Sequence, residues 1–416
     1  MNCKVYIFLY DLYFIRRRKY FFLLVKTLFF PTWFYYRFLS RKKKIFLFIR
    51  TDIFGIQLFE FQQLNQIALK LNETVHINHH PVVAGKFIFP DQIKQILKHR
   101  NVRIANHMNL ICRIYSQDIE NSISSRIKSN PKSIMKSFRE FGYGGNLLVH
   151  YTCPPFPTFS TLELDQYRNY LKIQLPDLNL DKKLIAVHSR SGNYPRYKVP
   201  DRVKDGFRNT KFSEINSAAK HFDTDSFSFV RIGHYESFDS STDDRILDAR
   251  MQMSLDPLLQ LAVFTNIKGY VGSSSGPLGF FAMQNLPCLL LSVYPIDTDY
   301  SKDPWSQIIV PKLIWDLKNQ RYLSVNEQFN YDLIRLQNKY NDTLLSEMNL
   351  EPRSLPESLT SQIYRNWQCS IISSSESTKW LDLSVSASHK LSEDLDQPNL
   401  PIIPIEYFSY LGEKNL

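Results

Sequence analysis

The chain has 416 residues, of which 44% are hydrophobic and 14% aromatic, and its formal net charge is +11. This length exceeds one ordinary core and the apolar content excludes wholesale disorder, so we expect two domains with extensions. The five cysteines are scattered and form no CxxC pair, which argues against a disulfide scaffold or a zinc knuckle and fits a reducing cytosol.

Residues 1–43 read as a basic, aromatic N-terminal extension. Basic residues 16–19 precede an aromatic run at 20–36, which Lys26 and Pro31 interrupt. Three interpretations stay open: an in-plane anchor on an anionic membrane surface, a helix packed on the folded body, and a membrane span. We expect a cytoplasmic protein, peripheral to the inner face of the cytoplasmic membrane if the anchor forms. Because no nucleic-acid module is recognisable, we expect no nucleic-acid partner.

Residues 44–160 read as an N-terminal domain in which strands and helices alternate. The sequence favours strands at 44–50, 73–80 and 101–107, and helices at 56–71 and 91–99. This alternation predicts a parallel sheet covered by helices, an α/β class of fold. A loop rich in proline and aromatic residues, 150–161, marks the boundary of this domain.

Residues 161–330 read as a second domain of the same α/β type. Strands are expected at 184–190, 226–237, 267–276 and 287–293, with a helix at 257–266 that Asp256 caps. Several of these strands end in polar residues, and open α/β sheets bind ligands at the carboxyl ends of their strands. After this domain we expect a helical segment at 331–371, and the Ser-, Glu- and Asp-rich composition of 372–416 predicts a partly disordered, mobile tail.

The segment expected as a strand at 267–276 ends in a turn made of serine and glycine. Gly272 and Gly276 allow a tight bend and a close ligand approach, and Pro277 suits the first turn of a helix. Free backbone amides at a helix start, together with hydroxyl groups, suit the oxygens of a diphosphate. The alternative is a serine cap with no ligand. The candidate phosphate-binding residues of this turn are Ser273, Ser274, Ser275 and Gly276.

Two arginines end neighbouring strands of the second domain. Arg190 ends AVHSR and Arg231 ends FVR, and a glycine follows each of them. Arginine binds phosphate oxygens bidentately, so we expect that at least one of them contacts phosphate. Each of them taken singly could instead be a surface ion-pair partner.

Four segments resemble a family of bacterial glycosyltransferases linked to surface carbohydrates. That family has a VHVR-x-x-x-Y strand end, a VRMGD-like strand end, a D-x-x-L helix and a GTSSG turn. The corresponding segments here, within roughly 180–320, are VHSRSGNY, VRIGH, DPLL and GSSSG. The VHSR segment also resembles the His-x-Arg strand end of fucosyltransferase-like enzymes. Ser273 replaces the family's threonine and keeps a hydroxyl, whereas His234 replaces an aspartate, so no carboxylate role is carried over to that position.

The resemblance implies a GT-B-like enzyme, with two Rossmann-like domains that face a central cleft. Such an enzyme would move a sugar from a nucleotide-diphosphate sugar to a hydroxyl of a glycan or glycolipid acceptor in surface polysaccharide or lipopolysaccharide synthesis. It would need no cofactor and no metal, because amides and basic side chains neutralise the leaving diphosphate. Candidates that could line the sugar or base pocket are Tyr194, Arg196, Tyr197, Gly233 and His234.

An inverting transfer requires a general base near the acceptor hydroxyl. Asp52, just after the first strand, is the first candidate, with a helix-capping carboxylate as its alternative. His188 is the second candidate, with a structural histidine as its alternative. The competing function is a non-catalytic protein that binds nucleotide sugars or carbohydrates on the same fold. An epimerase is disfavoured because RTDIFGIQ lacks the GxGxxG turn of nicotinamide chemistry.

Overall fold

A computed structural model describes residues 44–49, 74–79, 102–104, 159–190, 210–221, 223–233, 244–273, 277–284, 286–294, 307–330, 342–372, 375–395 and 401–412. The chain divides into two compact units, Met1–Pro157 and Thr158–Leu416. The extension at 1–43 and the helices expected at 56–71 and 91–99 lie outside the described residues. Within the described ranges, no helix combines the length and the hydropathy that a membrane crossing requires.

The first unit contains a small parallel sheet. Its strands are β1 (Lys44–Ile49), β2 (Thr74–His79) and β3 (Val102–Ile104), hydrogen-bonded in the order β1-β2-β3. Both pairings are parallel. The expected strands and their parallel arrangement are therefore confirmed.

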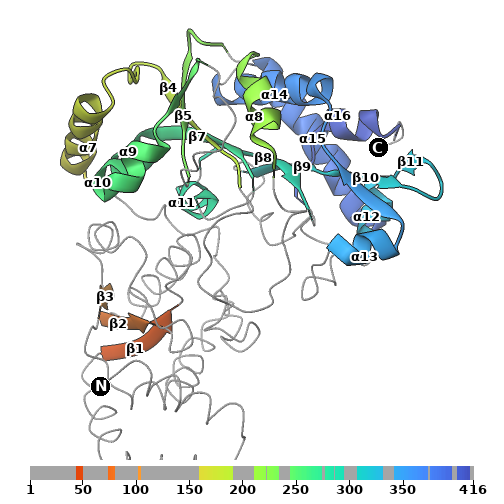
Figure 1. The fold of residues 1–416 in the computed structure, drawn as a ribbon, viewed down its shortest axis with the longest axis horizontal. Helices are drawn as coiled ribbons and strands as arrows, with labels where there is room; N and C mark the ends of the chain where they lie inside the picture. The colour runs from red at the N-terminus through yellow and green to blue at the C-terminus, as the bar shows by residue number, and fades with distance from the viewer. Residues whose placement is uncertain are drawn as a thin grey trace, which may run out of the picture. The chain divides into compact units, whose positions relative to one another are not determined.

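The second unit is built on a six-stranded parallel sheet (Figure 1). Its strands are β4 (Lys183–His188), β5 (Phe227–Arg231), β6 (Ile246–Asp248), β7 (Ile267–Gly272), β8 (Cys288–Val293) and β9 (Gln307–Pro311). They are hydrogen-bonded in the order β6-β5-β4-β7-β8-β9. In chain order this is 3-2-1-4-5-6, the order of Rossmann sheets, and the direction of winding reverses between β4 and β7.

Helices cover both faces of this sheet. One face carries α8 (Phe212–Ala219) and α14 (Glu357–Ile372), which pack over Ile185, Val271 and Leu289. The helices α10 (Pro257–Asn266) and α11 (Leu278–Met283) meet the opposite face through an aromatic group, in which Tyr270 of β7 stacks on Phe281 of α11. The central strands β4, β7 and β8 therefore bury side chains on both of their faces, as parallel strands do.

Side-chain caps mark the starts of α10 and of the helix that packs against it. The helix α7 (Thr161–Gln174) packs against α10, and α9 (Arg250–Leu255) precedes α10 in the chain. Ser160 caps α7 in a capping box with Glu163. Asp256 accepts hydrogen bonds from the backbone N–H groups of Leu258 and Leu259, at 2.9 and 3.2 Å, which confirms the predicted cap of α10.

A small antiparallel sheet follows the main one along the chain. It contains β10 (Leu313–Asp316), β11 (Arg321–Tyr322) and β12 (Leu350–Arg353), in the order β11-β10-β12. The short helices α12 (Val325–Asn330) and α13 (Asp342–Glu347) belong to the same stretch of chain. The expectation of a purely helical 331–371 was incomplete, because β12 gains its strand partners only from the distant residues of β10.

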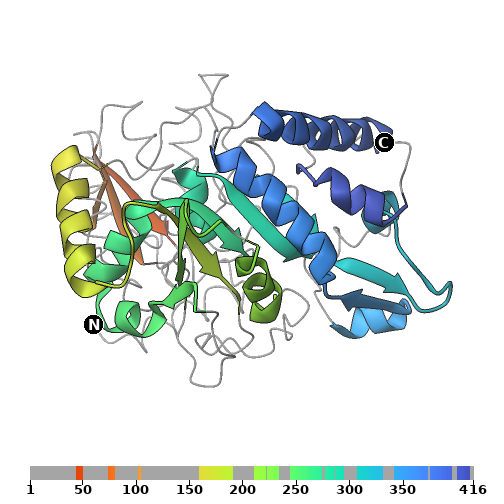
Figure 2. The same cartoon turned by 90° about the horizontal axis from the view of Figure 1, so that it is seen from above.

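The C-terminal region is ordered, which corrects the prediction of a mobile tail for its described part. It forms α15 (Ser375–Asp394) and α16 (Ile405–Tyr410), which lie beside α14 (Figure 2). Trp380, Leu391, Tyr407 and Phe408 are buried in the main core. The backbone N–H of Ile309 also donates to the carbonyl oxygen of Ile402, at 2.9 Å, so the end of the chain docks beside β9.

The serine content that predicted disorder has a structural use. Ser388 Oγ accepts from the backbone N–H of Ile403 at 2.9 Å, and Ser384 Oγ accepts from that of Ile405 at 3.2 Å. Both serines are buried on α15. These hydroxyls satisfy backbone donors that would otherwise be buried without a partner.

Candidate functional site

The strongest candidate site is the carboxyl edge of the main sheet between β4 and β7. After β4 the chain leads to α8 on one face, and after β7 it leads to α11 on the other (Figure 1). The next described helices after these two strands therefore lie on opposite faces of the sheet. Such a topological switch point is where open α/β sheets bind their ligands.

His188, the last residue of β4, joins three strand ends at this edge. Its carbonyl oxygen accepts from the backbone N–H of Ser273, at 3.1 Å. Its Nδ1 lies 3.0 Å from the carbonyl oxygen of Ile232, just after β5. The side chain is buried at 6% exposure. His188 thus holds the ends of β4, β5 and β7 together.

Two glycines make room for this histidine. A Cβ at Gly272 would lie 2.0 Å from the His188 carbonyl oxygen, which no real contact allows. A Cβ at Gly233 would lie 2.5 Å from His188 Nδ1, and Gly233 has φ +117°, a conformation that glycine adopts without strain. Gly233 therefore has a packing role here, beside the pocket-lining role that the sequence suggested.

The environment of His188 keeps its imidazole neutral. Its pKa is lowered to about 4, chiefly by burial and also by the positive charges of Arg231, Arg250 and Arg190, against the hydrogen bond to Ile232, which raises it. Because the carbonyl of Ile232 can only accept, Nδ1 carries the proton. An imidazole with this pKa accepts a proton poorly at neutral pH. The geometry therefore favours the structural alternative for His188 over the general base.

Arg231, at the end of β5, is buried under the edge. Its side chain is 1% exposed, its Cζ lies 3.3 Å from the centroid of the Phe212 ring, and its Nη1 lies 3.7 Å from Asp248 Oδ2. This placement does not support the predicted contact with phosphate. A buried arginine needs partners such as this aromatic ring and this carboxylate. Both lie far from Arg231 in the sequence, so the residues next to Arg231 did not indicate them.

Sequence reasoning missed Asp248, the last residue of β6, and Arg250, which lies two residues later. Arg250 donates to Asp248 through Nε at 2.8 Å and through Nη2 at 2.7 Å, a bidentate pair. Burial alone would raise the pKa of Asp248, but these hydrogen bonds and the charges of Arg250 and Arg231 lower it. The pair connects β6 to the arginine at the end of β5. The only sequence signal was the segment DAR, which begins at the last residue of a short strand.

Ser273 and Arg190 are brought together at the switch point. Ser273 Oγ accepts from the backbone N–H of Arg190 at 2.7 Å, and the Ser273 carbonyl accepts from the Tyr270 hydroxyl at 2.7 Å. Ser273 is 1% exposed, whereas Arg190 is only partly buried. Ser273 therefore ties the segment after β4 to the end of β7, and Arg190 is the more accessible of the two predicted arginines.

The helix after the serine turn is short. It begins at Leu278, directly after Pro277, and ends at Met283. Six residues make fewer than two turns, so the dipole contribution expected at this helix start is small. Any anion site at the turn depends more on arginine side chains and on backbone amides.

Other predicted site residues lie outside the described part of the chain: Asp52, Tyr194, Arg196, Tyr197, His234, Ser274, Ser275 and Gly276. Their roles stay predictions. Within the described ranges, no group of three or more His, Cys, Asp and Glu side chains is arranged to hold a metal ion.

Comparison with known proteins gives weak similarities only. No family model matches this chain, and no curated protein matches it in sequence. Among solved structures, the ADP-heptose LPS heptosyltransferase II of E. coli is 10% identical, with a TM-score of 0.35 over 64% of this chain and 90% of that one. The glycosyl transferase family 9 protein of Veillonella parvula DSM 2008 is 10% identical, with a TM-score of 0.42 over 78% and 97%. The iron-containing dodecameric glycosyltransferase TibC of enterotoxigenic E. coli H10407 is 9% identical, with a TM-score of 0.31 over 64% and 61%.

Proposed function

We propose that this chain is a glycosyltransferase that moves a sugar from a nucleotide-diphosphate sugar to a hydroxyl acceptor. The observation that carries the proposal is the 3-2-1-4-5-6 order of the main sheet, with Arg190 and Ser273 joined at its switch point. Rossmann sheets bind nucleotides at that position. Two of the four sequence motifs, VHSR and GSSSG, give independent support, because His188 of the first pairs with Gly272 of the second at this point.

In this proposal the diphosphate lies against the segments after β4 and β7. Arg190 contacts it directly, together with the turn residues Ser274, Ser275 and Gly276. Arg231 and Arg250 lie beneath the surface, and their effect on the pKa of His188 indicates a positive potential at this edge. Positive groups fixed before the reaction stabilise the charge that develops on a departing diphosphate.

The remaining parts of the proposal follow from the sequence. The proposal includes a two-domain GT-B organisation, independence from metal, and a glycan or glycolipid acceptor. It also includes contact between residues 1–43 and a membrane surface. Asp52 is the general base of this proposal, because the low pKa of His188 disfavours the histidine.

The proposal is tested by incubating the whole chain with nucleotide-diphosphate sugars that differ in base and sugar, and measuring the melting temperature. Ligands that bind only the folded state raise it. Arg190→Ala should weaken binding of the best ligand by about 1.5–3 kcal/mol, the contribution of a charged hydrogen bond. The control is Arg168→Ala, which removes an exposed arginine of α7 that pairs with Asp181.

Two results separate the possible outcomes. Unchanged affinity in Arg190→Ala removes that residue from the site, and no response to any nucleotide sugar removes the proposed function. Binding without measurable sugar transfer would identify a non-catalytic binding protein instead. Transfer that survives EDTA would support metal independence.

A further inference from the structure

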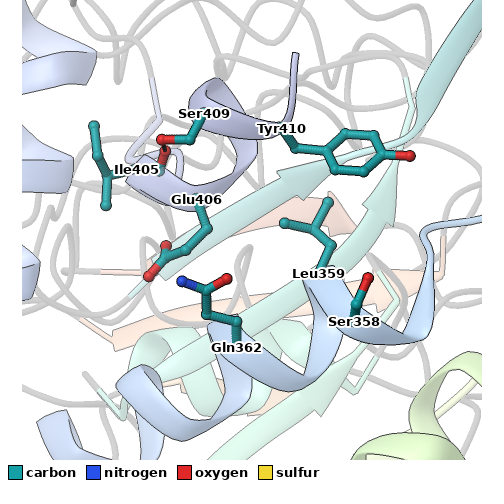
Figure 3. A pocket seen from close by; sticks show the side chains of 7 residues that line it. All are labelled: Ser358, Leu359, Gln362, Ile405, Glu406, Ser409 and Tyr410. Atoms are coloured by element: carbon teal, nitrogen blue, oxygen red, sulfur yellow. Dashed lines mark hydrogen bonds between the residues drawn. The ribbon is translucent and has the colours of Figure 1, made fainter. Parts of the chain in front are cut away.

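A pocket of about 360 Å³ lies between α14 and α16, separate from the switch point (Figure 3). Leu359 and Glu406 are buried parts of its wall, and four exposed residues surround them. The lining residues are Ser358, Leu359, Gln362, Ile405, Glu406, Ser409 and Tyr410. The volume falls in the lower range of small-molecule sites.

Glu406 is the unusual residue of this pocket. It is 6% exposed, and its Oε1 accepts hydrogen bonds from Trp380 Nε1, at 2.8 Å, and from Asn366 Nδ2. Its second oxygen, Oε2, is buried and has no hydrogen-bond partner in the described part of the chain. Figure 3 shows the Glu406 side chain extending from α16 toward α14, with its carboxylate beside the Gln362 amide. A buried carboxylate oxygen without a donor is costly.

The other lining residues indicate which kind of ligand could donate a hydrogen bond to Glu406 Oε2. Of the seven lining residues, Glu406 alone is charged, so a positive ligand is favoured over a neutral or a negative one. Ser358, Ser409 and Gln362 add hydroxyl and amide groups, and the Tyr410 ring is 41% exposed.

We propose that this pocket binds a small primary ammonium ligand that carries hydroxyl groups, of which a 2-amino sugar is the chemical type. The ammonium group donates to Glu406 Oε2, and the ligand hydroxyls meet the serine and glutamine side chains of the rim. The Gln362 amide lies beside the Glu406 carboxylate (Figure 3), and in this proposal the exposed Gln362 side chain changes rotamer to admit the ammonium group to Oε2. The site is independent of the proposed nucleotide site.

The experiment uses the whole chain and a matched pair of probes, D-glucosamine and D-glucose, which differ in one amino group. Titration calorimetry at a pH where the amine is protonated should detect glucosamine, with glucose at least tenfold weaker. Glu406→Gln keeps an oxygen for Trp380 and Asn366 but removes the negative charge, so it should weaken glucosamine binding at least tenfold. The control is Glu357→Gln, which removes an exposed carboxylate from the start of α14 and should leave the affinity unchanged.

A second variant keeps the proposal testable if Glu406→Gln fails to fold. Ser358→Trp places a bulky ring on an exposed position of the rim and should abolish glucosamine binding, with the far-ultraviolet circular dichroism of the wild type retained. Equal binding of glucose and glucosamine, or full binding by Glu406→Gln or by a folded Ser358→Trp, would overturn the proposal. Nucleotide-sugar binding should be unaffected in all three variants, which separates this site from the proposed active site.

Discussion

At the scale of single residues, neighbours decide the chemistry of a side chain more than its type does. His188 and Arg231 both looked like reactive groups at strand ends. His188 is instead buried between two glycines and a carbonyl, and Arg231 lies between an aromatic ring and a carboxylate. Both residues hold strand ends together, and Arg190 is left as the more accessible cation of the predicted pair.

The neutral state of His188 predicts how the stability of the fold depends on pH. Its folded pKa is about 4, below the ordinary value of 6.5. Between these values the unfolded chain binds a proton that the folded chain does not. The stability that the folded state gains from the neutral imidazole is therefore lost as the pH falls from above 6.5 toward 4. The free energy of unfolding decreases by up to about 3 kcal/mol over this range.

This dependence can be measured as the free energy of unfolding in urea between pH 7 and pH 4. His188→Asn keeps an amide donor for the Ile232 carbonyl but cannot titrate. It should lower stability at pH 7 through the lost packing, and its stability should then fall less steeply with decreasing pH than that of the wild type. Parallel pH curves for the two proteins would mean that His188 is not buried neutral.

At the scale of elements, local sequence signals were sufficient to predict a helix or strand whose formation depends mainly on its own residues. The helix at 257–266 was expected at the bounds that it has, because proline and an aspartate cap mark its start. The strands β4, β7 and β8 were likewise found from short apolar runs. The strand β12 escaped notice because its partner β10 lies more than thirty residues away.

Removing the Asp256 cap of α10 should cause a measurable loss of stability. Asp256→Ala should reduce the free energy of unfolding by about 1 kcal/mol through the lost cap, and more because Asp256 also accepts from the Tyr170 hydroxyl of α7. Asp256→Asn should retain most of the cap. Tyr170→Phe removes only the contact between the two helices, so urea midpoints of the three variants separate the two effects. A midpoint for Asp256→Ala equal to that of the wild type would rule out the capping role.

At the scale of the whole molecule, the C-terminal helices complete the main core. Trp367 of α14 and Trp380 of α15 belong to the same buried cluster as the strands of the sheet. The pocket at Glu406 exists only because α16 returns to α14. Removing this region would therefore expose one face of the sheet.

Two leucines of α15 offer a matched test of this packing. Leu391 is 2% exposed, and Leu383 is 49% exposed. Leu391→Ala should cost about 2–5 kcal/mol through the cavity it leaves, whereas Leu383→Ala should stay within about 0.5 kcal/mol of the wild type. Chemical denaturation of both variants checks this difference. Small and equal effects would indicate a loosely attached tail, as the composition alone suggested.

The amino-acid sequence by itself determined the α/β class, the parallel sheets, most of the strands of the main sheet and the polar character of their carboxyl ends. These features depend on patterns within ten or twenty residues, where periodicity and capping act. The tertiary structure alone decided that Arg231 is buried on Phe212, that Ser273 holds Arg190, and that the serine-rich C-terminal region packs as helices. Each of these results depends on contacts between residues far apart in the chain, whose burial and hydrogen bonding no local pattern records.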